Sequence, residues 1–455
     1  MIALAHSRGA SLAFHHWVPA LAVAHSMLTG CGIRDSDLIV APASDGEPLA
    51  LSQPIIDAID ARPIGGASLT TGTSGGGSYA QARAARTIYQ VATLSDLKKR
   101  VSGDTPAVVL VAEGQYTGAG EMRTLQVCTE ACAATDPVAE QTLEASSCHA
   151  DSKLFDLAIT TDTLRVGSNK TIIGLGRGAQ LIDISVVLDG SSNLILRNLS
   201  IENVSSGVVP VSDGLSLDPA DHVWLDHLTF RDVSSAAINI VSKWDQDNAQ
   251  SVLTESGYIT LSNVHLDGFV SGSCGQRSER MLTTNRTPAL TVTGSWFEGA
   301  RIRSPSAFGP GTWMHLFNNF WSNIDGRGLE LSCGAAVIAE GNTLQSAHNG
   351  LYNSDTGAPS WQFCSAGYYG TLYAPIGKGG AEENLLDASS SMNLGGQPTT
   401  GSGLTLPISM GGSDVKLTVP VVSGTSTETY QVTLIADPAT VAARVQANAG
   451  VGKRF

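Results

Sequence analysis

Charged residues are scarce in this chain, and basic residues are the scarcer kind. Only 15% of the 455 residues are charged, and 27 lysines and arginines stand against 41 aspartates and glutamates, which gives a formal net charge of −14. This balance argues against nucleic acid or an anionic membrane surface as the main partner. It does not exclude an anionic polymer, because a local basic cleft is enough to bind one. Such a cleft has candidate cations in Arg231, Lys243, Arg301 and Arg303.

Long apolar runs are also lacking beyond the N-terminal 31 residues, so no other segment approaches the length of a transmembrane helix. The segment WVPALAVAHSMLTGC is mostly apolar, is interrupted by His25 and has Arg8 upstream. It resembles a signal peptide over residues 1–31 that ends in a bacterial lipobox, with Cys31 lipidated as the new N-terminus. A plain cleaved signal, or a start codon misassigned upstream of one, is the alternative. We expect a secreted or outer-surface protein whose membrane contact is limited to a lipid anchor on Cys31.

Seven cysteines are present, and setting Cys31 aside leaves an even six. Three of the six crowd into one Gly/Thr/Ala-rich stretch, which suits disulfide-stapled loops in an oxidising compartment. A zinc site would need closer Cys-x-x-Cys pairs or nearby histidines. We therefore expect disulfides and no bound metal. The six cysteines are Cys128, Cys132, Cys148, Cys274, Cys333 and Cys364.

Short β-branched segments recur along the chain at intervals of roughly 22 to 35 residues. The shorter intervals are close to one coil of a parallel β-helix. A β-sandwich would instead show turn signals every 8 to 12 residues. The spacing, with 49 glycines and few helical stretches, predicts an all-β protein: a single-stranded solenoid of the right-handed parallel β-helix type. We expect it to be a monomer. The segments begin at Asn169, Ser192, Asp221, Gly257, Ala289, Thr312 and Ala335.

Polar residues fall at similar places in the turns of these units. Side chains at such positions can stack inside a solenoid and join successive coils by hydrogen bonds. We predict such a stack for Asn198, His227, Asn263, Asn319 and Asn342.

The composition divides the chain into four parts. Residues 1–31 are the signal peptide, and residues 32–78 are rich in Ala, Ser, Gly and Pro without an apolar period, which is typical of a linker. Residues 79–386 form the predicted β-helix, and residues 387–455 supply strands and a helix that pack on its outside. Insertions at 242–255 and 271–286 break the repeat, and in solenoids such insertions commonly build the binding face.

Several strings, taken together and in order, resemble the pectate lyase/pectin lyase family of polysaccharide lyases. They are SNKTIIGLGRGAQL (168–181), SNLILRNL (192–199), DGLSLD (213–218), VWLDH (223–227), HLFNNFW (315–321) and AEGN (339–342), with VQANAGVG (445–452) near the end. The resemblance covers about residues 85–375 and implies the β-helix fold. It also implies β-elimination on an acidic plant cell-wall polysaccharide, pectin or polygalacturonate.

The resemblance implies roles for particular residues. Arg303, in an Arg-x-Pro setting upstream of HLFNN, matches the base of pectin lyases, and Arg301 takes the role if the alignment is off by two. The alternative places Arg303 in a surface salt bridge on a turn. Asp213 matches the acidic residue that ligates calcium in pectate lyases and pairs with an arginine in pectin lyases. Its alternative role is to cap backbone amides in a turn.

The sequence departs from the family's motifs at two functional positions, the calcium ligands of pectate lyases and the second active-site arginine of pectin lyases. The positions of two further calcium-binding aspartates fall on Ser235 and Asn239, and one carboxylate with a serine and an amide is a poor calcium site. We therefore expect no cofactor. The second active-site arginine of pectin lyases would also fall on Ser235, so Arg231 or Lys243 would have to replace it.

The resemblance further implies disulfides Cys132–Cys274, Cys128–Cys148 and Cys333–Cys364. Trp244 and Trp313 are candidate sugar-stacking residues, although tryptophans in strands usually pack in cores. We expect His227 and His315 to be structural.

The leading expectation is a calcium-independent pectin lyase. The alternatives are a pectate lyase with a calcium site rebuilt around Asp245 or Asp247, and a non-catalytic carbohydrate-binding β-helix protein.

Overall fold

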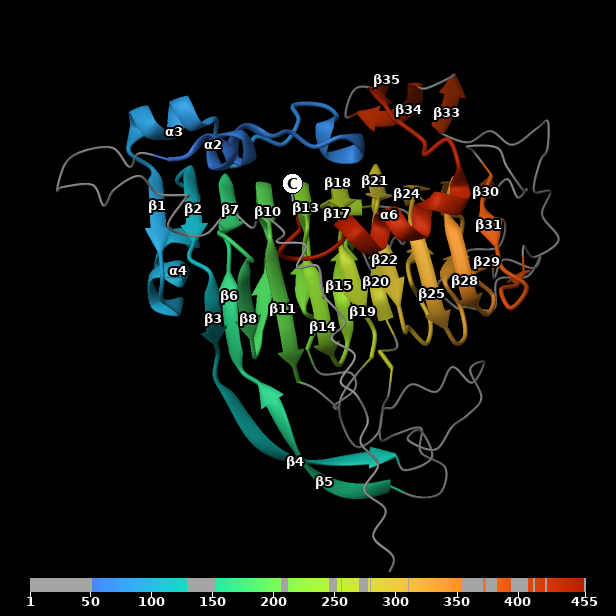
Figure 1. Cartoon of the computed structure of the whole chain (residues 1–455), viewed down its shortest axis with the longest axis horizontal. Helices are drawn as coiled ribbons and strands as arrows, with labels where there is room; N and C mark the ends of the chain where they lie inside the picture. The colour runs from blue at the N-terminus through green and yellow to red at the C-terminus, as the bar shows by residue number, and fades with distance from the viewer. Residues whose placement is uncertain are drawn as a thin grey trace, which may run out of the picture. The chain divides into compact units, whose positions relative to one another are not determined.

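The computed structural model describes residues 51–128, 152–205, 212–244, 252–254, 256–269, 277–278, 280–309, 311–353, 371–373, 383–393, 408–411, 414–421 and 424–453. Three long parallel sheets run through these residues, one of ten strands and two of nine (Figure 1). The chain visits sheet I, then sheet II, then sheet III, and returns to sheet I one coil further on. This arrangement confirms the predicted right-handed parallel β-helix, since parallel crossovers are right-handed in nearly all proteins.

Sheet I holds the strands that carry most of the recurring sequence segments. In spatial order its strands are β1 (Ile88–Val91), β2 (Ala107–Val111), β7 (Lys170–Gly174), β10 (Ser191–Arg197), β13 (Ala220–Asp226), β18 (Gly257–Ser262), β21 (Leu290–Thr293), β24 (Trp313–Phe317), β27 (Ala336–Glu340) and β30 (Thr371–Tyr373).

Sheet II follows sheet I after a short corner. Its strands are β3 (Gly114–Thr117), β8 (Ala179–Ile182), β11 (Leu199–Val204), β14 (Thr229–Val233), β19 (His265–Asp267), β22 (Trp296–Glu298), β25 (Phe320–Ile324), β28 (Thr343–Ala347) and β31 (Leu385–Leu386).

Sheet III completes each coil. Its strands are β6 (Asp162–Arg165), β9 (Ile184–Val187), β12 (Leu215–Leu217), β15 (Ala236–Val241), β20 (Arg280–Asn285), β23 (Ser306–Phe308), β26 (Leu329–Ser332), β29 (Leu351–Asn353) and β32 (Met392–Asn393). Two antiparallel ribbons lie outside the coils: β4 (Gly120–Cys128) with β5 (Ser152–Thr160), and β16 (Lys243–Trp244) with β17 (Val252–Thr254).

The interior is one continuous apolar column to which all three sheets contribute. Val223 of sheet I, Phe230 of sheet II and Ile238 of sheet III belong to one buried cluster and are fully shielded from solvent. Helix α4 (Leu94–Val101) adds Leu97 and Val101 to the same cluster near its N-terminal end. Because alternate strand residues point inward, each coil delivers its apolar side chains to this column and its polar ones to the surface.

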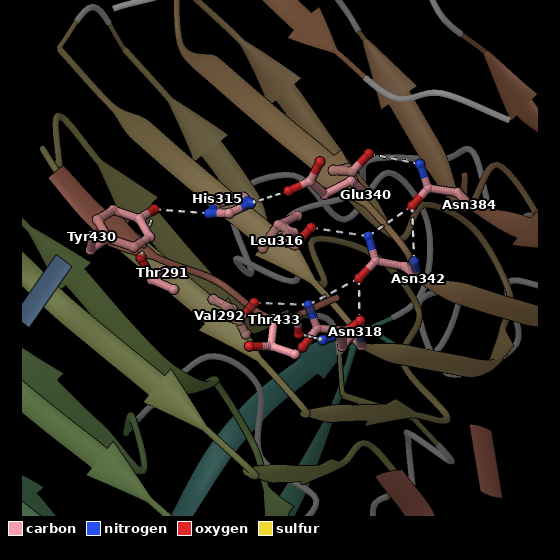
Figure 2. Close-up of polar contacts among 12 residues, drawn as sticks. Thr291, Val292, His315, Leu316, Asn318, Glu340, Asn342, Asn384, Tyr430 and Thr433 are labelled. Atoms are coloured by element: carbon pink, nitrogen blue, oxygen red, sulfur yellow. Dashed lines mark hydrogen bonds and ion pairs between the residues drawn. The ribbon is translucent and has the colours of Figure 1, made fainter. Parts of the chain in front are cut away.

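The corner between sheets I and II holds the polar stack, and the stack contains only part of the predicted set. Asn319 donates to Asn342 Oδ1 at 3.1 Å, and Asn342 donates to Asn384 Oδ1 at 2.8 Å (Figure 2). Both also donate to backbone carbonyls of the preceding coil, at Val292 and Leu316. The ladder thus satisfies buried amide groups between successive coils.

Three of the five predicted members lie outside this stack, although Asn198 donates to the Gly174 carbonyl and Asn263 to Asp226 Oδ1 of the preceding coil. Asn198, His227 and Asn263 have φ values of 55°, 52° and 53°, so they occupy the left-handed corner position one residue before the inward-pointing site. The left-handed region is open to asparagine at modest cost, which explains the residue type at this corner.

The linker prediction was wrong for residues 51–78, and residues 32–50 lie outside the described part. Helix α2 (Gln53–Asp60) buries Ile55 and Ile59 against sheet I, and the short helix η1 (Gly65–Ser68) and helix α3 (Tyr79–Ala85) follow it. The Gly66 amide donates to Thr291 Oγ1 at 2.9 Å, and a Cβ on Gly66 would lie 1.7 Å from the Ala289 carbonyl oxygen. Glycine at this position therefore allows the backbone to approach the sheet closely, and it does not indicate a flexible linker.

The C-terminal segment also packs on the coils. It contains β33 (Ile408–Gly411), β34 (Asp414–Val421), β35 (Gly424–Gln431), η3 (Pro438–Thr440) and α6 (Val441–Asn448). Tyr430 is buried with Phe317 of sheet I, and Val441 of α6 is buried with Phe320 of sheet II. In the described part of the chain, no helix is long and apolar enough to cross a membrane. The signal peptide and Cys31 lie outside the described residues.

Candidate functional site on sheet III

Sheet III carries a row of polar side chains on its outer face. The register pairs Ser216 with Asn239, Asn239 with Thr283, Thr283 with Ser306, and Ser306 with Glu330. Because adjacent strands lie about 4.8 Å apart, this row crosses five coils in about 20 Å. The row places side chains that are far apart in sequence on one surface.

Asp213 lies two residues before β12, on the corner that leads into sheet III. Its Oδ1 accepts a hydrogen bond from the Ala236 amide at 3.1 Å, and its Oδ2 accepts one from Asn239 Nδ2 at 2.9 Å. Its backbone carbonyl accepts from Ser185 Oγ at 2.6 Å. The carboxylate therefore joins two coils, in agreement with its alternative role as an acceptor for backbone amides.

The chemistry next to Asp213 does not suit a hard cation. Asn239 turns its amide nitrogen to Asp213, and its carbonyl oxygen accepts from Thr283 Oγ1 at 2.6 Å. Calcium binds oxygen ligands, and both carboxylate oxygens of Asp213 are already held by N–H donors. Ser235 is buried, and its backbone carbonyl accepts from Ser278 Oγ. Within the described residues, no group of three or more His, Cys, Asp or Glu side chains is arranged to hold a metal ion.

Arg303 lies three residues before Ser306 and just outside β23. It has φ of 56°, and its carbonyl accepts from the Met281 amide at 3.2 Å, so the neighbouring strand fixes its backbone. Its Nε lies 3.7 Å from Glu330 Oε2, and its side chain is 23% exposed. A non-glycine residue held in the left-handed region carries a small conformational cost and is frequent at functional sites.

Glu330 connects Arg303 to a second arginine that the sequence-based reasoning missed. Its Oε1 accepts from Arg327 Nη1 at 2.8 Å, and its side chain is only 6% exposed. The Arg327 guanidinium also lies 4.5 Å from the centre of the Tyr352 ring, within cation–π range. Two partly exposed arginines thus cover one buried carboxylate.

Arg301 lies on the corner between sheets II and III. Its amide donates to the Ser278 carbonyl at 2.9 Å, and its carbonyl accepts from the amides of Gly326 and Arg327. Its backbone therefore joins two coils next to Arg303.

Two of the predicted site residues lie on other sheets than Arg303 and Asp213, and their roles stay predictions. Arg231 is on β14 of sheet II, where its Nε lies 3.1 Å from Asp267 Oδ2. Trp313 is on β24 of sheet I, where it packs against the cluster of Phe317 and Tyr430. A coil turns through three faces within about 25 residues, so residues that are close in sequence can lie on different sheets.

Lys243 and Trp244 form β16, directly after the corner that ends β15. The structure describes their backbone only, so their roles stay predictions. Asp245 and Asp247, the residues of the rebuilt calcium site, lie outside the described residues.

Among the cysteines, Cys333 is buried and disulfide-bonded. Its predicted partner Cys364 lies outside the described residues, as do Cys132, Cys148 and Cys274. Cys128 ends β4, and its pairing stays a prediction.

The fold and the site define a parallel β-helix with an arginine-centred polar site on the outer face of one sheet. The family model for pectate lyase matches residues 133–358. Probable pectin lyase F of Emericella nidulans is 31% identical over 205 residues, which are 43% of this chain and 41% of that relative. Probable pectin lyase E of Aspergillus fumigatus is 27% identical over 401 residues, 84% of this chain and 93% of the relative.

Solved structures show the same fold. A pectate lyase from Bacillus sp. N165 in complex with trigalacturonate aligns with a TM-score of 0.51 at 18% identity, covering 86% of this chain and 99% of that one. A pectate lyase from Acidovorax avenae subsp. citrulli aligns with a TM-score of 0.51 at 18% identity, covering 92% and 98%. The family model and these relatives show that the chain is similar to the pectate lyase/pectin lyase family of polysaccharide lyases, as its motifs predicted.

Proposed function

We propose that this protein is a calcium-independent lyase that cleaves pectin, the methyl-esterified form of polygalacturonan, by β-elimination with Arg303 as the base. The observation that carries the proposal is that Arg303 and Arg327, which face the Glu330 carboxylate, lie at the same sheet as Asp213, whose carboxylate accepts hydrogen bonds from Asn239 and the Ala236 amide. A methyl-esterified uronyl group carries no charge for a metal to neutralise. Ser235 and Asn239 stand where calcium would need carboxylates beside Asp213, so the described part of the site matches this substrate better than free polygalacturonate.

The reaction would proceed in a defined order. For this step the Arg303 guanidinium must first give up a proton to solvent. Its free nitrogen then takes the proton from C5, which the adjacent ester makes acidic, and the released electron pair forms the C4–C5 double bond. The C4–O bond breaks with its electrons on the oxygen, and that oxygen takes up a proton on leaving. Positive charge beside the ester stabilises the enolate-like transition state.

Within this proposal, water access to Arg303 is limited by its surroundings. The side chain is about three-quarters buried, and the carboxylate of Glu330 beneath it is almost fully buried. Electrostatic interactions with the substrate are stronger in such a site than in bulk water. The burial therefore supports Arg303 as the reacting group more than it supports an exposed arginine elsewhere on the sheet.

The test measures absorbance of the unsaturated uronide produced from highly methylated pectin and from polygalacturonate, each with and without a chelator. We expect product from methylated pectin that the chelator does not reduce. Activity on polygalacturonate that is lost with chelator and restored by calcium would favour a pectate lyase with a rebuilt metal site. If neither polymer yields unsaturated product, a carbohydrate-binding protein without catalysis would be favoured.

A further inference from the structure

A cavity of about 450 Å³ lies on the outer face of sheet I, on a different sheet from the candidate site. Its volume falls within the range of small-molecule sites, roughly 300–1,000 Å³. Arg62 of the N-terminal segment and Asn448, the last residue of α6, also line it, so both terminal segments border the cavity and it suits a small molecule more than a long polymer. Its floor includes the last residue of each of four neighbouring strands, namely Arg197, Asp226, Ser262 and Thr293.

The floor carries a buried ion pair whose charges are already offset. Asp226 Oδ2 accepts from Arg197 Nε at 2.9 Å, and Asp226 Oδ1 accepts from Ser262 Oγ at 2.6 Å. The Arg197 and Asp226 side chains are only 4% and 2% exposed. Because the positive and negative charges lie side by side, the floor is no electrostatic barrier to an anionic ligand.

Thr293 contributes a buried hydroxyl to the wall of the cavity. Its backbone carbonyl accepts from the Asn263 amide and from Ser295 Oγ, but its hydroxyl forms no hydrogen bond with any residue that the structure describes. By contrast, the hydroxyl of Thr291 on the same strand accepts from the Gly66 amide at 2.9 Å. Thr293 is 8% exposed, and a buried hydroxyl without a partner is unfavourable. The side chain therefore indicates a polar occupant of the cavity.

Arg62 places a positive charge at the mouth of the cavity. It is exposed, and its Nη1 donates to the carbonyls of Ile59 and Ala61 at 3.2 Å and 2.7 Å, which holds the guanidinium at the end of α2. In the described part of the chain, no carboxylate forms an ion pair with it, and its Nε and Nη2 have no partner. These two nitrogens form the fork with which arginine binds a carboxylate through two parallel hydrogen bonds.

Asn448 and Ile64 complete the mouth. Asn448 Nδ2 donates to the Arg444 carbonyl at 2.8 Å, and its Oδ1 stays an acceptor without a partner among the described residues. Ile64 is 45% exposed and offers apolar surface to the C–H groups of a ligand. A cation, a hydroxyl and an amide oxygen beside apolar surface match a carboxylate that carries hydroxyl groups on a short carbon skeleton.

We propose that this cavity binds a small hydroxy acid, a compound with a carboxylate and at least one hydroxyl group. The carboxylate binds to Arg62, and the hydroxyl groups pair with the Thr293 hydroxyl and with Asn448 Oδ1. A sugar acid and a non-sugar hydroxy acid share this chemistry. The site is independent of the proposed function, because it uses no residue of sheet III and needs no turnover. A bound acid joins the N-terminal segment to α6 and therefore also stabilises the folded chain.

The experiment measures binding to the full chain by isothermal titration calorimetry. The probes are D-galacturonate, L-malate and D-galactose, which keeps the sugar hydroxyls but has no carboxylate. We expect one of the two acids to bind at least about tenfold more tightly than D-galactose, since charge-assisted hydrogen bonds are the stronger kind. The acid with the lower Kd identifies the source of the ligand. At saturation it should raise Tm by at least about 2 °C. No heat of binding and no rise in Tm with either acid would overturn the proposal.

Two variants locate the bound acid. Arg62→Gln should raise Kd at least about tenfold, because it removes the only charge that faces the carboxylate in the described mouth. Arg83→Gln is its matched control, since Arg83 is an exposed arginine of α3 that does not line the cavity, and its Kd should equal that of wild type. An equal rise in Kd in the two variants would show a general charge effect and contradict the site.

Thr293→Val keeps the branched shape and removes only the hydroxyl. It should raise Kd at least about threefold, while Tm of the unliganded protein stays the same or rises, because an unpaired buried hydroxyl is lost. Thr291→Val, which removes the partner of the Gly66 amide, should instead lower Tm. This contrast separates a ligand-binding hydroxyl from a structural one, and it tests the site even where Arg62→Gln does not fold. Unchanged Kd in Thr293→Val and Arg62→Gln would place the acid elsewhere and refute the site, whatever the activity on pectin.

Discussion

Asn239 donates a hydrogen bond from its side-chain amide to Asp213 Oδ2 at 2.9 Å, across neighbouring strands of sheet III. The same amide group accepts from Thr283 at 2.6 Å, so its orientation is fixed from both sides. An amide that presents nitrogen to a carboxylate occupies the space where a cation would otherwise sit. The pair thus explains in atomic terms why the departure at position 239 works against calcium.

This relationship predicts that a calcium site can be built by substitution. In Ser235→Asp/Asn239→Asp, three carboxylates would lie within reach of one another, and we expect calcium to relieve their repulsion. At a calcium concentration of 100 times Kd the gain in stability is about 2.7 kcal/mol. Thermal unfolding in calcium and in chelator would show a calcium-dependent Tm for the double variant. An Asn239→Leu control should show none, and an equal calcium effect on wild type would contradict the argument.

Removal of the guanidinium at position 303 is predicted to abolish turnover. Arg303→Ala should lower kcat/KM by 10² to 10⁴-fold or more, because a positioned base typically contributes that much. Stability should fall by only about 1 kcal/mol, since Arg327 still pairs with Glu330. Initial rates of unsaturated product and thermal unfolding measure the two effects. Arg301→Ala is the partner variant, and a reversal of the two phenotypes would move the base to Arg301.

Much of the fold could be predicted from sequence because a solenoid repeats the same physical unit. Each coil needs apolar strand residues at a constant spacing, and the recurring segments supplied that period. The position within the turn was harder to predict. Asn198 and Asn319 have similar neighbours in sequence, but one sits at the left-handed corner and the other at the next, inward-pointing residue. A shift of one residue reverses the side chain's direction.

The site was predictable only where motif and register coincide. Arg303 and Asp213 were found by motif. Arg327 and Glu330 were missed because neither lies in one of the recognised motifs, and only the pairing of β23 with β26 brings them to Arg303. Arg231 was chosen because it is close to Ser235 in sequence, but the chain turns the corner from sheet II to sheet III between them.

A buried charged network around Asp226 of sheet I predicts that the protein loses stability at low pH. Burial alone would raise the pKa of Asp226. The hydrogen bond and charge of His227, the charge of Arg197 and the hydroxyl of Ser262 outweigh burial and hold that pKa below its ordinary value. A lowered folded-state pKa stabilises the protein above the unfolded pKa of about 3.9 and ceases to do so as the pH falls through the folded value.

Replacement of this carboxylate should therefore matter most at neutral pH. We expect Asp226→Asn to cost about 3–5 kcal/mol at pH 7, because Arg197 is left buried without its counter-charge. The gap to wild type should start to narrow as the pH drops below about 3.9, where the carboxyl of the unfolded chain takes up a proton, and should close below the lowered pKa of the folded state, where the folded wild-type carboxyl is also protonated. Denaturant unfolding over this pH range measures the gap. Asp267→Asn, in an exposed pair with Arg231, should cost under about 1 kcal/mol. A gap that is constant with pH would contradict the argument.

The stack of asparagines predicts a local dependence on one amide. Asn342 donates to Asn384 and to the Leu316 carbonyl, and its own oxygen accepts from Asn319 (Figure 2). Asn342→Ala would leave buried donors and acceptors on three coils unsatisfied, at about 1–3 kcal/mol for each. We expect a loss of at least about 2 kcal/mol in denaturant unfolding. Gln345→Ala, at an exposed position nearby on β28, should change stability by about 0.5 kcal/mol or less.

Tyr430 of the C-terminal segment forms a hydrogen bond with His315 of sheet I, and the last prediction concerns this contact. The phenol lies 2.8 Å from His315 Nδ1, and His315 Nε2 lies 2.9 Å from Glu340 Oε1, all in the interior (Figure 2). Burial, together with the charge of Glu340, raises the pKa of Tyr430 despite the opposing hydrogen bond from Thr291, so the phenol keeps its proton and donates it to His315. The imidazole then donates from Nε2 to the carboxylate.

Tyr430→Phe keeps the ring and removes only the donor, which leaves His315 Nδ1 buried without its partner. We expect a loss of about 1–3 kcal/mol and faster proteolytic cleavage within the C-terminal segment, with the β-helix core intact. Denaturant unfolding and limited proteolysis followed by mass spectrometry measure the two effects. Tyr89→Phe is the matched control, since Tyr89 is partly exposed beneath Arg100 and should change stability little. Equal stability and equal cleavage in the two variants would show that ring packing alone, without the hydrogen bond to His315, holds the segment in place.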